Sequence, residues 1–276
     1  MNNLQSNSLG SLPNRGNLRI AQPTVVEPVI YRSNQSIITS YGATPSVSTI
    51  EIASSQSTLS SYLHKSGISS LNDIPSCHIH QVFEINDTLP SGSENRFTIK
   101  THDNESIFLA SEGSTPRDRL LCGSSRSFMM HLMDKQYQEA LTMKRDFGCR
   151  LFCLPMRMQS LEVWLNPGIL LGVVQEKFSI KDRLIVIESE RGQELYKVRI
   201  SLGHSICMPK EYHFRIMTAD EQQQSGTITR QWNTDISSYT INIYFADTGM
   251  DPKIKSLFLG LGFLLEYLYF QGRSCC

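Results

Sequence analysis

The stretch DPKIKSLFLGLGFLLEYLYF, residues 251–270, decides how the rest of the chain is interpreted. Asp251 is a favourable residue type for the N-cap of a helix, and Pro252 is tolerated in a first helical turn. Residues 257–265 are then apolar or glycine without a break. A helix that is hydrophobic on all sides has to be buried, either in a protein core or in a bilayer.

The length of this helix favours a protein core. From Ser256 to Phe270 it would extend about 22 Å at 1.5 Å per residue, which is short of the ~30 Å hydrocarbon layer of a membrane. Glu266 would also place a costly carboxylate in the lipid. Gly260 and Gly262 suit close contact with surrounding walls, where a larger side chain would not fit. We therefore expect residues 252–270 to form a helix that fills the folded domain and does not span a bilayer.

Composition limits the class of protein. The chain has 276 residues and a formal net charge of zero, so no overall field attracts nucleic acid, and none is predicted as a partner. The amino terminus shows no basic segment followed by an apolar run, so no secretory signal is expected. Seven cysteines, an odd number, then indicate free thiols in a reducing compartment.

The first 70 residues differ in composition from the rest of the chain. They are rich in Ser, Asn, Gln and Thr and contain no Phe, Trp or Cys. Such a segment cannot bury enough apolar surface to offset the entropy lost on ordering. We predict a disordered tail over residues 1–70 and one folded domain over residues 71–276.

Within that domain, short apolar runs rich in β-favouring residues recur about every ten residues, with turn signals between them. The candidate strands are residues 97–100, 107–111, 128–133, 139–143, 161–165, 170–175, 184–188, 195–200, 212–217, 227–232 and 240–245. Many antiparallel strands at this spacing predict an all-β sandwich or barrel. A single apolar helix after some eleven strands could fill the interior of a barrel wider than eight strands.

Five runs carry a family resemblance: FTIKTHDNESIFLASEGS, CGSSRSFMMHLMDKQYQEALTMKR, NPGILLGVV, GTITRQW and DPKIKSLFLGLGFLLEYLYF, in this order. Together they resemble the phospholipid scramblase family over residues 71–271. The resemblance implies a closed, about twelve-stranded tubby-like barrel around a carboxy-terminal helix. It also implies calcium-stimulated, ATP-independent movement of phospholipids between the leaflets of a membrane.

The resemblance further implies a calcium site, in an acidic loop just before the last helix. Ca²⁺ takes six to eight oxygen ligands. The candidate ligands here are Asp247 and Asp251, whereas residues 237–239, where the family has a leading acidic pair, contain no acid. The alternative is that Asp247 belongs to a turn and Asp251 starts the helix, because Asp is common in both roles.

The family often carries a palmitoylated cysteine run, and the matching stretch here keeps Cys149 and Cys153. Arg145, Arg150 and Arg157 flank them, which suits an anionic membrane face. Two acyl chains suffice for stable anchoring, and the alternative is a pair of ordinary thiols. The terminal pair Cys275-Cys276 is not a CaaX box and is interpreted as two exposed thiols.

No catalytic constellation stands out, so the protein is not expected to be an enzyme. The predicted location is the cytoplasmic face of the plasma membrane, with phospholipid as partner and self-association left open. A barrel filled by its own helix has no lumen for a headgroup, so transport would require oligomers, a thinned bilayer or a polar groove outside. A lipid-binding or signalling adaptor without transport activity is the alternative function.

Overall fold

The computed structural model of the chain describes residues 67–82, 94–146, 158–201, 211–234 and 238–271. The predicted tail lies outside these residues up to position 66. The first described element is a short 3-10 helix, η1 (Gly67–Leu71), whose Ile68 and Leu71 side chains are buried in the core. The folded unit therefore includes Gly67.

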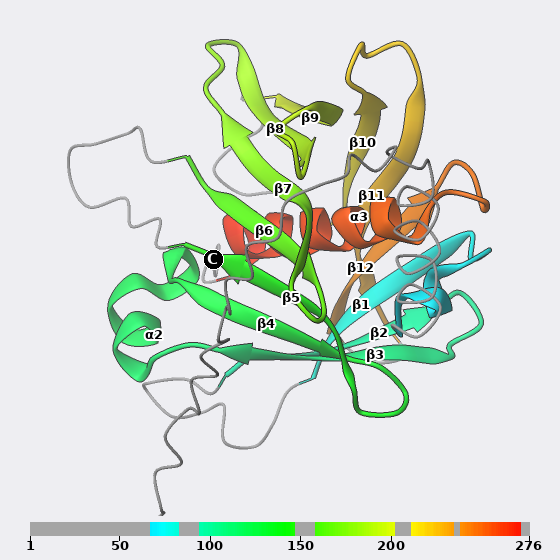
Figure 1. Cartoon of the computed structure of the whole chain (residues 1–276). Coiled ribbons are helices and arrows are strands. Elements are labelled where there is room, and N and C mark those ends of the chain that lie inside the picture. The colour runs from blue at the N-terminus through cyan, green and yellow to red at the C-terminus, as the bar shows by residue number, and fades with distance from the viewer. Residues whose placement is uncertain (1–66, 83–93, 147–157, 202–210, 235–237, 272–276) are drawn as a thin grey trace, which may run out of the picture. The chain divides into compact units, whose positions relative to one another are not determined.

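The described strands form one closed antiparallel barrel in which consecutive strands are neighbours and β1 pairs with β12 (Figure 1). The pairing between β9 and β10 is the shortest, with Tyr196 opposite Thr218 and Lys197 opposite Met217. The twelve strands are β1 (Ser76–Val82), β2 (Arg96–Thr101), β3 (Ser106–Gly113), β4 (Phe128–Met133), β5 (Glu139–Arg145), β6 (Ser160–Leu165), β7 (Ile169–Lys177), β8 (Asp182–Ser189), β9 (Glu194–Ser201), β10 (Tyr212–Thr218), β11 (Gln224–Asn233) and β12 (Ser238–Phe245).

The predicted barrel is confirmed, and each of the eleven predicted strands lies within a strand of the structure. The strand missing from the prediction is β1, which closes the barrel. Its Ile79 pairs with Ile241 on β12 and Ile99 on β2. Only Cys77 and Ile79 of this strand are buried, and they alternate with the partly exposed His78 and His80. The alternation is therefore too short and too polar to stand out in the sequence.

The predicted helix is also confirmed, and it lies inside the barrel. It consists of α3 (Pro252–Leu265) and a continuing π-helical turn, η4 (Glu266–Phe270). Figure 1 shows α3 enclosed by the strands, with β6, β7 and β12 packed against it. All side chains from Lys255 to Tyr267 are buried. No helix within the described residues is long and apolar enough to cross a membrane.

Glycines allow the helix and the walls to approach each other closely. A Cβ atom added to Gly260 would lie 2.7 Å from Val163 Cγ2, and one added to Gly262 would lie 3.1 Å from Ile243 Cδ1. In the walls, a Cβ atom on Gly226 would lie 2.7 Å from the carbonyl oxygen of Tyr244 and 3.0 Å from the Phe258 ring. A side chain at Gly260 or Gly226 would force its neighbours to shift, and one at Gly262 would be a tight fit, which limits how the helix sits in the barrel.

The first turns of α3 bury a positive charge. Lys255 is fully buried, and its Nζ atom donates hydrogen bonds to the carbonyl oxygens of Leu71, Ile74 and Thr248 at 2.9, 3.1 and 2.7 Å. These three acceptors match the three donors of an ammonium group. Burial lowers the pKa of Lys255, and the charges of Asp73, Cys77 and Asp247 partly offset that effect. Lys255 thereby ties the helix to η1 and to the turn that precedes α3.

A first prediction tests the fit of the helix in the barrel. Replacing Gly260 with Leu should lower the free energy of unfolding by about 1–3 kcal/mol, because the new side chain would overlap Val163. Chemical denaturation monitored by near-ultraviolet circular dichroism measures this loss. Gly113→Leu is the matched control, since an added Cβ there meets its nearest atom, Met129 O, at 3.7 Å. Equal stability of the two variants would show that α3 is not held against the wall.

Candidate functional site

The barrel has two mouths that differ in the connections between strands. Because neighbouring strands are antiparallel, connections that follow odd-numbered strands lie at one mouth and those that follow even-numbered strands lie at the other. α3 follows β12, so it enters at the second mouth, called here the entry mouth, and ends at the first, called the exit mouth. The entry mouth has short turns, such as residues 102–105 and 190–193.

The exit mouth carries longer connections. Residues 114–127 link β3 to β4 and include α2 (Pro116–Cys122) and the single turn η3 (Gly123–Ser125). In Figure 1, α2 lies on the left, on the same side as the red, C-terminal end of the central helix. Thr115 caps α2, because its Oγ1 atom accepts a hydrogen bond from the backbone N–H of Asp118 at 3.1 Å.

A buried polar network closes the exit mouth around the end of the helix. The Arg126 guanidinium donates two hydrogen bonds to the Glu112 carboxylate, at 2.6 and 2.7 Å. The Tyr267 hydroxyl donates to Glu112 at 2.6 Å, and Asn95 donates to both Glu112 and Tyr267. Burial alone would raise the pKa of Glu112, but the hydrogen bonds and charge of Arg126 hold it below its ordinary value. The carboxylate is therefore fully paired and serves to position Tyr267.

Arg145 takes part in the same closure, which corrects one expectation from the sequence. The expectation was that Arg145 faces an anionic membrane. Its side chain is buried, with hydrogen bonds to Gln159 Oε1 at 2.6 and 3.2 Å and to the carbonyl oxygen of Ser124 at 2.7 Å. Burial lowers the pKa of Arg145 to about 10. Its position on the inward face of β5 explains the difference, since alternate residues of a strand point into the barrel.

Glu266, at the end of α3, is the second buried carboxyl group at this mouth. Its nearest cation is Arg230 on β11, with Nε 3.6 Å from the carboxylate. The Arg230 guanidinium also lies over the rings of Tyr239 and Phe270, with its central carbon 3.6 and 4.2 Å from the ring centres. Burial raises the pKa of Glu266, and the nearby Arg230 charge only partly offsets this effect.

A surface pocket of about 190 Å³ lies at the exit mouth beside α2. It combines three hydroxyl side chains with charges of both signs. Lys144 Nζ lies 3.6 Å from Asp146, and Asp118 accepts a hydrogen bond from Ser127 Oγ at 3.4 Å. Its lining residues are Gly113, Ser114, Thr115, Asp118, Ser127, Phe128, Met129, Lys144, Arg145 and Asp146. We did not predict this pocket, and the only sequence signal for it is the turn-forming run of residues 113–116.

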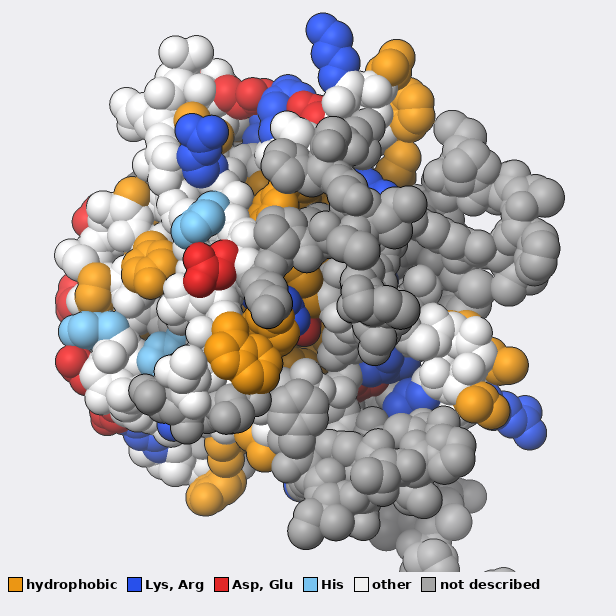
Figure 2. All heavy atoms as spheres, turned by 180° about the vertical axis from the view of Figure 1, so that it is seen from behind, with side chains coloured by type: hydrophobic (Ala, Val, Ile, Leu, Met, Phe, Trp, Pro, Cys, Tyr) orange, Lys and Arg blue, Asp and Glu red, His pale blue; other side chains and the backbone are white. Residues whose placement is uncertain are grey.

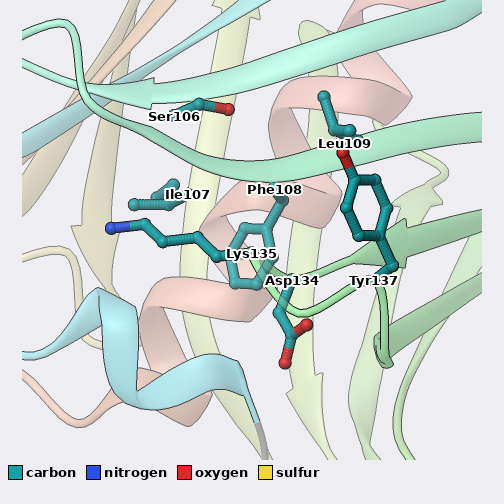
Figure 3. A pocket seen from close by; sticks show the side chains of 7 residues that line it. All are labelled: Ser106, Ile107, Phe108, Leu109, Asp134, Lys135 and Tyr137. Carbon is teal, nitrogen blue, oxygen red and sulfur yellow. The ribbon is translucent and has the colours of Figure 1, made fainter.

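A second pocket of the same volume lies at the entry mouth, between β3 and the turn after β4 (Figure 3). The Asp134 carboxylate accepts hydrogen bonds from the backbone N–H groups of Gln136 and Gln138, so it stabilises the turn. Lys135 forms an ion pair with Glu105. In Figure 3 the Tyr137 ring lies beside Leu109, which leaves an apolar wall there. This pocket has one cation, Lys135, and one acid, Asp134, and lacks the group of three hydroxyl side chains found beside α2.

The two predicted calcium ligands lie before α3, and each carboxylate already has a local partner. Asp247 Oδ1 accepts a hydrogen bond from the backbone N–H of Gly249 at 2.9 Å, and Asp251 Oδ1 accepts one from Lys253 N–H at 2.8 Å. Asp251 is thus the N-cap of α3. The described residues contain no group of three or more His, Cys, Asp or Glu side chains that could hold a metal ion. Two engaged carboxylates do not fit the six to eight ligands of Ca²⁺.

The predicted acylation sites Cys149 and Cys153 lie outside the described residues, as do Cys275 and Cys276. In the sequence, Cys149 and Cys153 lie between β5 and β6. Strand β5 ends at the exit mouth, and β6 begins there. Among the described cysteines, Cys77 is buried, and burial raises the pKa of its thiol to about 12.

The raised pKa of Glu266 predicts how stability depends on pH. Above the ordinary value of 4.5 and below the raised pKa, the folded chain binds more protons than the unfolded chain. The free energy of unfolding should therefore fall as pH rises through this window, by ~1.4 kcal/mol for each unit of the shift. Urea denaturation at several pH values should show this fall in the wild type and in the exposed-site control Glu190→Gln. Persistence of the same fall in Glu266→Gln would contradict the assignment.

Comparisons with known proteins agree with the fold. The family model described as Scramblase matches residues 55–272. The chain is 27% identical over 214 residues to phospholipid scramblase 2 of Bos taurus, which covers 74% of this chain and 71% of the relative. It is 26% identical over 216 residues to phospholipid scramblase 1 of Homo sapiens, covering 75% and 67% of the two chains.

A more distant relative, phospholipid scramblase family member 5 of Homo sapiens, is 23% identical over 213 residues, covering 74% of this chain and 77% of the relative. No solved structure matches the chain. The family model covers well over half of the sequence, including every strand and the central helix. The chain therefore belongs to the scramblase family.

Proposed function

We propose that this protein moves phospholipids between the two leaflets of a membrane without using ATP. The observation that carries the proposal is the match of the family model to residues 55–272, supported by relatives that are named phospholipid scramblases. The function is translocation of intact lipid, so no bond of the lipid is broken and no catalytic residues are required.

The pocket beside α2 is the part of the described surface best suited to a phospholipid headgroup. Lys144 supplies a cation for the phosphate, and the hydroxyl groups of Thr115 and Ser127 supply hydrogen-bond donors. Asp118 and Asp146 supply negative charge for the amine or choline group. A zwitterionic headgroup needs both signs of charge within a small space, which is the combination found here.

The route of the lipid must lie outside the barrel. The lumen is filled by α3, and buried polar groups close the exit mouth around Tyr267. A headgroup would therefore travel along the outer surface, or between copies of the chain, while the acyl chains stay in the bilayer. Self-association and local thinning of the bilayer are the two ways to shorten such a path.

For location, the proposal is attachment to the cytoplasmic face of the plasma membrane through acyl chains on Cys149 and Cys153. In the sequence both cysteines lie between β5 and β6, two strands that meet at the exit mouth, which also carries the pocket beside α2. Two acyl chains give stable attachment, whereas one gives only marginal binding.

Calcium has a minor part in this proposal. The carboxylates of Asp247 and Asp251 are engaged by backbone N–H groups, so binding of Ca²⁺ there would displace existing hydrogen bonds. We expect an affinity no better than about millimolar, at the weak end for oxygen-ligand sites. Any calcium stimulation of transport should then need similarly high concentrations.

A second candidate function is that of a lipid-binding or signalling adaptor that transports nothing. The specific observation in its favour is the filled lumen, because a solid barrel can serve as a scaffold as readily as a transporter. Both functions predict membrane binding, and only the first predicts movement of lipid.

Reconstitution of the purified chain in liposomes with a fluorescent reporter lipid tests the transport proposal. The wild type should move the reporter between leaflets without ATP, and calcium below millimolar concentration should change the rate little. Lys144→Gln should slow transport about three- to fivefold, because one partly exposed charge contact with the phosphate is lost. Lys135→Gln, in the equally large entry-mouth pocket, is the control and should leave the rate unchanged.

Three results would count against this proposal. Absence of lipid movement in liposomes to which the chain binds would favour the adaptor function. Equal rates for Lys144→Gln and the wild type would remove the pocket beside α2 from the lipid path. Micromolar calcium binding that is lost in Asp247→Ala would show that the acidic residues form a true site.

The acylation proposal has its own test in cells. Replacing both Cys149 and Cys153 with Ser should move most of the protein from the membrane fraction to the supernatant, and either single change should have a partial effect. Cys122→Ser is the control, since this cysteine lies on α2 outside the proposed segment. A double variant that stays fully in the membrane fraction would show that acyl chains at these positions are not the anchor.

A further inference from the structure

The apolar side chains that the barrel leaves exposed are concentrated at the exit mouth. Ten large hydrophobic side chains are exposed within the described residues. Seven of the ten lie at this mouth, on α2, at the ends of strands or between β7 and β8: Val82, Leu120, Leu121, Met129, Phe178, Ile180 and Trp232. A contiguous exposed apolar patch marks a surface that meets a partner, and a shared mouth brings these side chains to one face of the barrel.

Two pairs among these seven residues project from the body of the barrel. Leu120 and Leu121 are 66% and 79% exposed on α2, a helix that has no buried residue. Phe178 and Ile180 are 69% and 84% exposed in the connection between β7 and β8. Side chains this exposed add almost nothing to the stability of the barrel, because little of their surface is removed from water. We call these two pairs the apolar tips.

Each apolar tip has an exposed basic residue beside it, namely Arg117 on α2 and Lys181 after Ile180. Figure 2 shows hydrophobic side chains that project next to blue Lys or Arg side chains at the upper and right margins of the molecule. The acids next to the tips have partners within the chain. Asp182 forms an ion pair with Arg199 at 3.0 Å, and Asp118 accepts a hydrogen bond from Ser127. An exposed positive charge therefore lies beside each tip, next to Asp118 on α2 and next to the paired Asp182 after Ile180.

Apolar tips with adjacent basic residues are the combination that inserts into the surface of an anionic bilayer. The side chains enter the boundary between headgroups and acyl chains, while Lys and Arg contact lipid phosphates. A bilayer also accepts separate projections, because it has no fixed shape, whereas a protein partner would need a surface that matches both tips. Two separate apolar tips therefore fit a lipid bilayer better than a second protein.

We infer that the exit mouth is the membrane-docking face of this protein and that Leu120, Leu121, Phe178 and Ile180 insert into the bilayer. The choice of a membrane as partner rests on the proposed function, but docking requires no lipid transport. Docking in this orientation places the pocket beside α2 next to the headgroups. The inserted side chains hold the barrel on the membrane, and this attachment is independent of acyl chains.

Sedimentation of the full chain with phospholipid vesicles tests the inference. The chain is produced without acylation and mixed with vesicles of phosphatidylcholine and phosphatidylserine, or of phosphatidylcholine alone. The wild type should bind, and should bind better to the vesicles with phosphatidylserine. Changing all four tip residues to Ser should weaken binding at least about tenfold, because their apolar surface would no longer leave water.

A matched control is available at the opposite mouth. Leu109 and Tyr137 are 42% and 76% exposed there, and Leu109→Ser with Tyr137→Ser should leave vesicle binding unchanged. Both variants should keep a cooperative melting transition, since every altered side chain is at least 42% exposed. Equal loss of binding in the control and in the tip variant would overturn the inference, as would unchanged binding in the tip variant.

Two further outcomes separate this inference from its alternatives. A dimer in light scattering that the tip variant splits, with vesicle binding kept, would assign the tips to a second copy of the chain and overturn the inference. A wild type that binds through the tips yet moves no lipid would overturn the transport proposal and support this one.

Discussion

The structure depends on burial of the apolar helix α3 inside the barrel. A helix with no polar face has no stable position in water, and a twelve-stranded barrel with nothing inside has no core. Each element therefore supplies what the other lacks. The glycines set how tightly the two can fit. Gly260 and Gly262 on the helix let wall side chains pack directly against its backbone, and Gly226 in the wall leaves room for the Phe258 ring.

Burying the helix raises a problem at each end, where its polar groups would meet an apolar interior. The two ends are satisfied differently. At the entry mouth, Lys255 donates to three backbone carbonyl groups, so the charge is held by main chain alone. At the exit mouth, Tyr267 joins a side-chain network with Glu112 and Arg126. A carbonyl cluster is compatible with short turns, whereas a side-chain network requires residues from several strands, and this difference sets the two mouths apart.

Much of this fold can be predicted from the sequence, because its strands and its helix follow from local patterns of apolar residues. Alternation of apolar residues indicates eleven strands, and the length of the apolar run places the helix in a core. Apolar alternation does not reveal the strand β1, because its outward positions are His78 and His80 and only two of its residues are buried. Arg145 was misread for a related reason. A charged residue at a strand end looks exposed, and only the register shows that it points inward.

The pocket beside α2 and the apolar tips could not be predicted in this way, because both depend on closure of the barrel. Leu120 and Phe178 are far apart in the sequence, and each alone would be unremarkable as an exposed apolar residue. They share a mouth only because connections after odd-numbered strands gather there. The signal lies in their common location, which is a property of the topology.

The same topology limits how the protein can act on lipid. The helix fills the lumen and leaves no path through the barrel, so any work on phospholipid has to take place on its outside. The entry mouth, with its short turns and engaged carboxylates, offers little that a membrane would bind. The exit mouth carries the mixed-charge pocket, most of the exposed apolar side chains and the strand ends that flank Cys149 and Cys153. An asymmetric barrel of this kind meets a membrane in one orientation, and that orientation brings the pocket to the headgroups while the helix stays in the protein core.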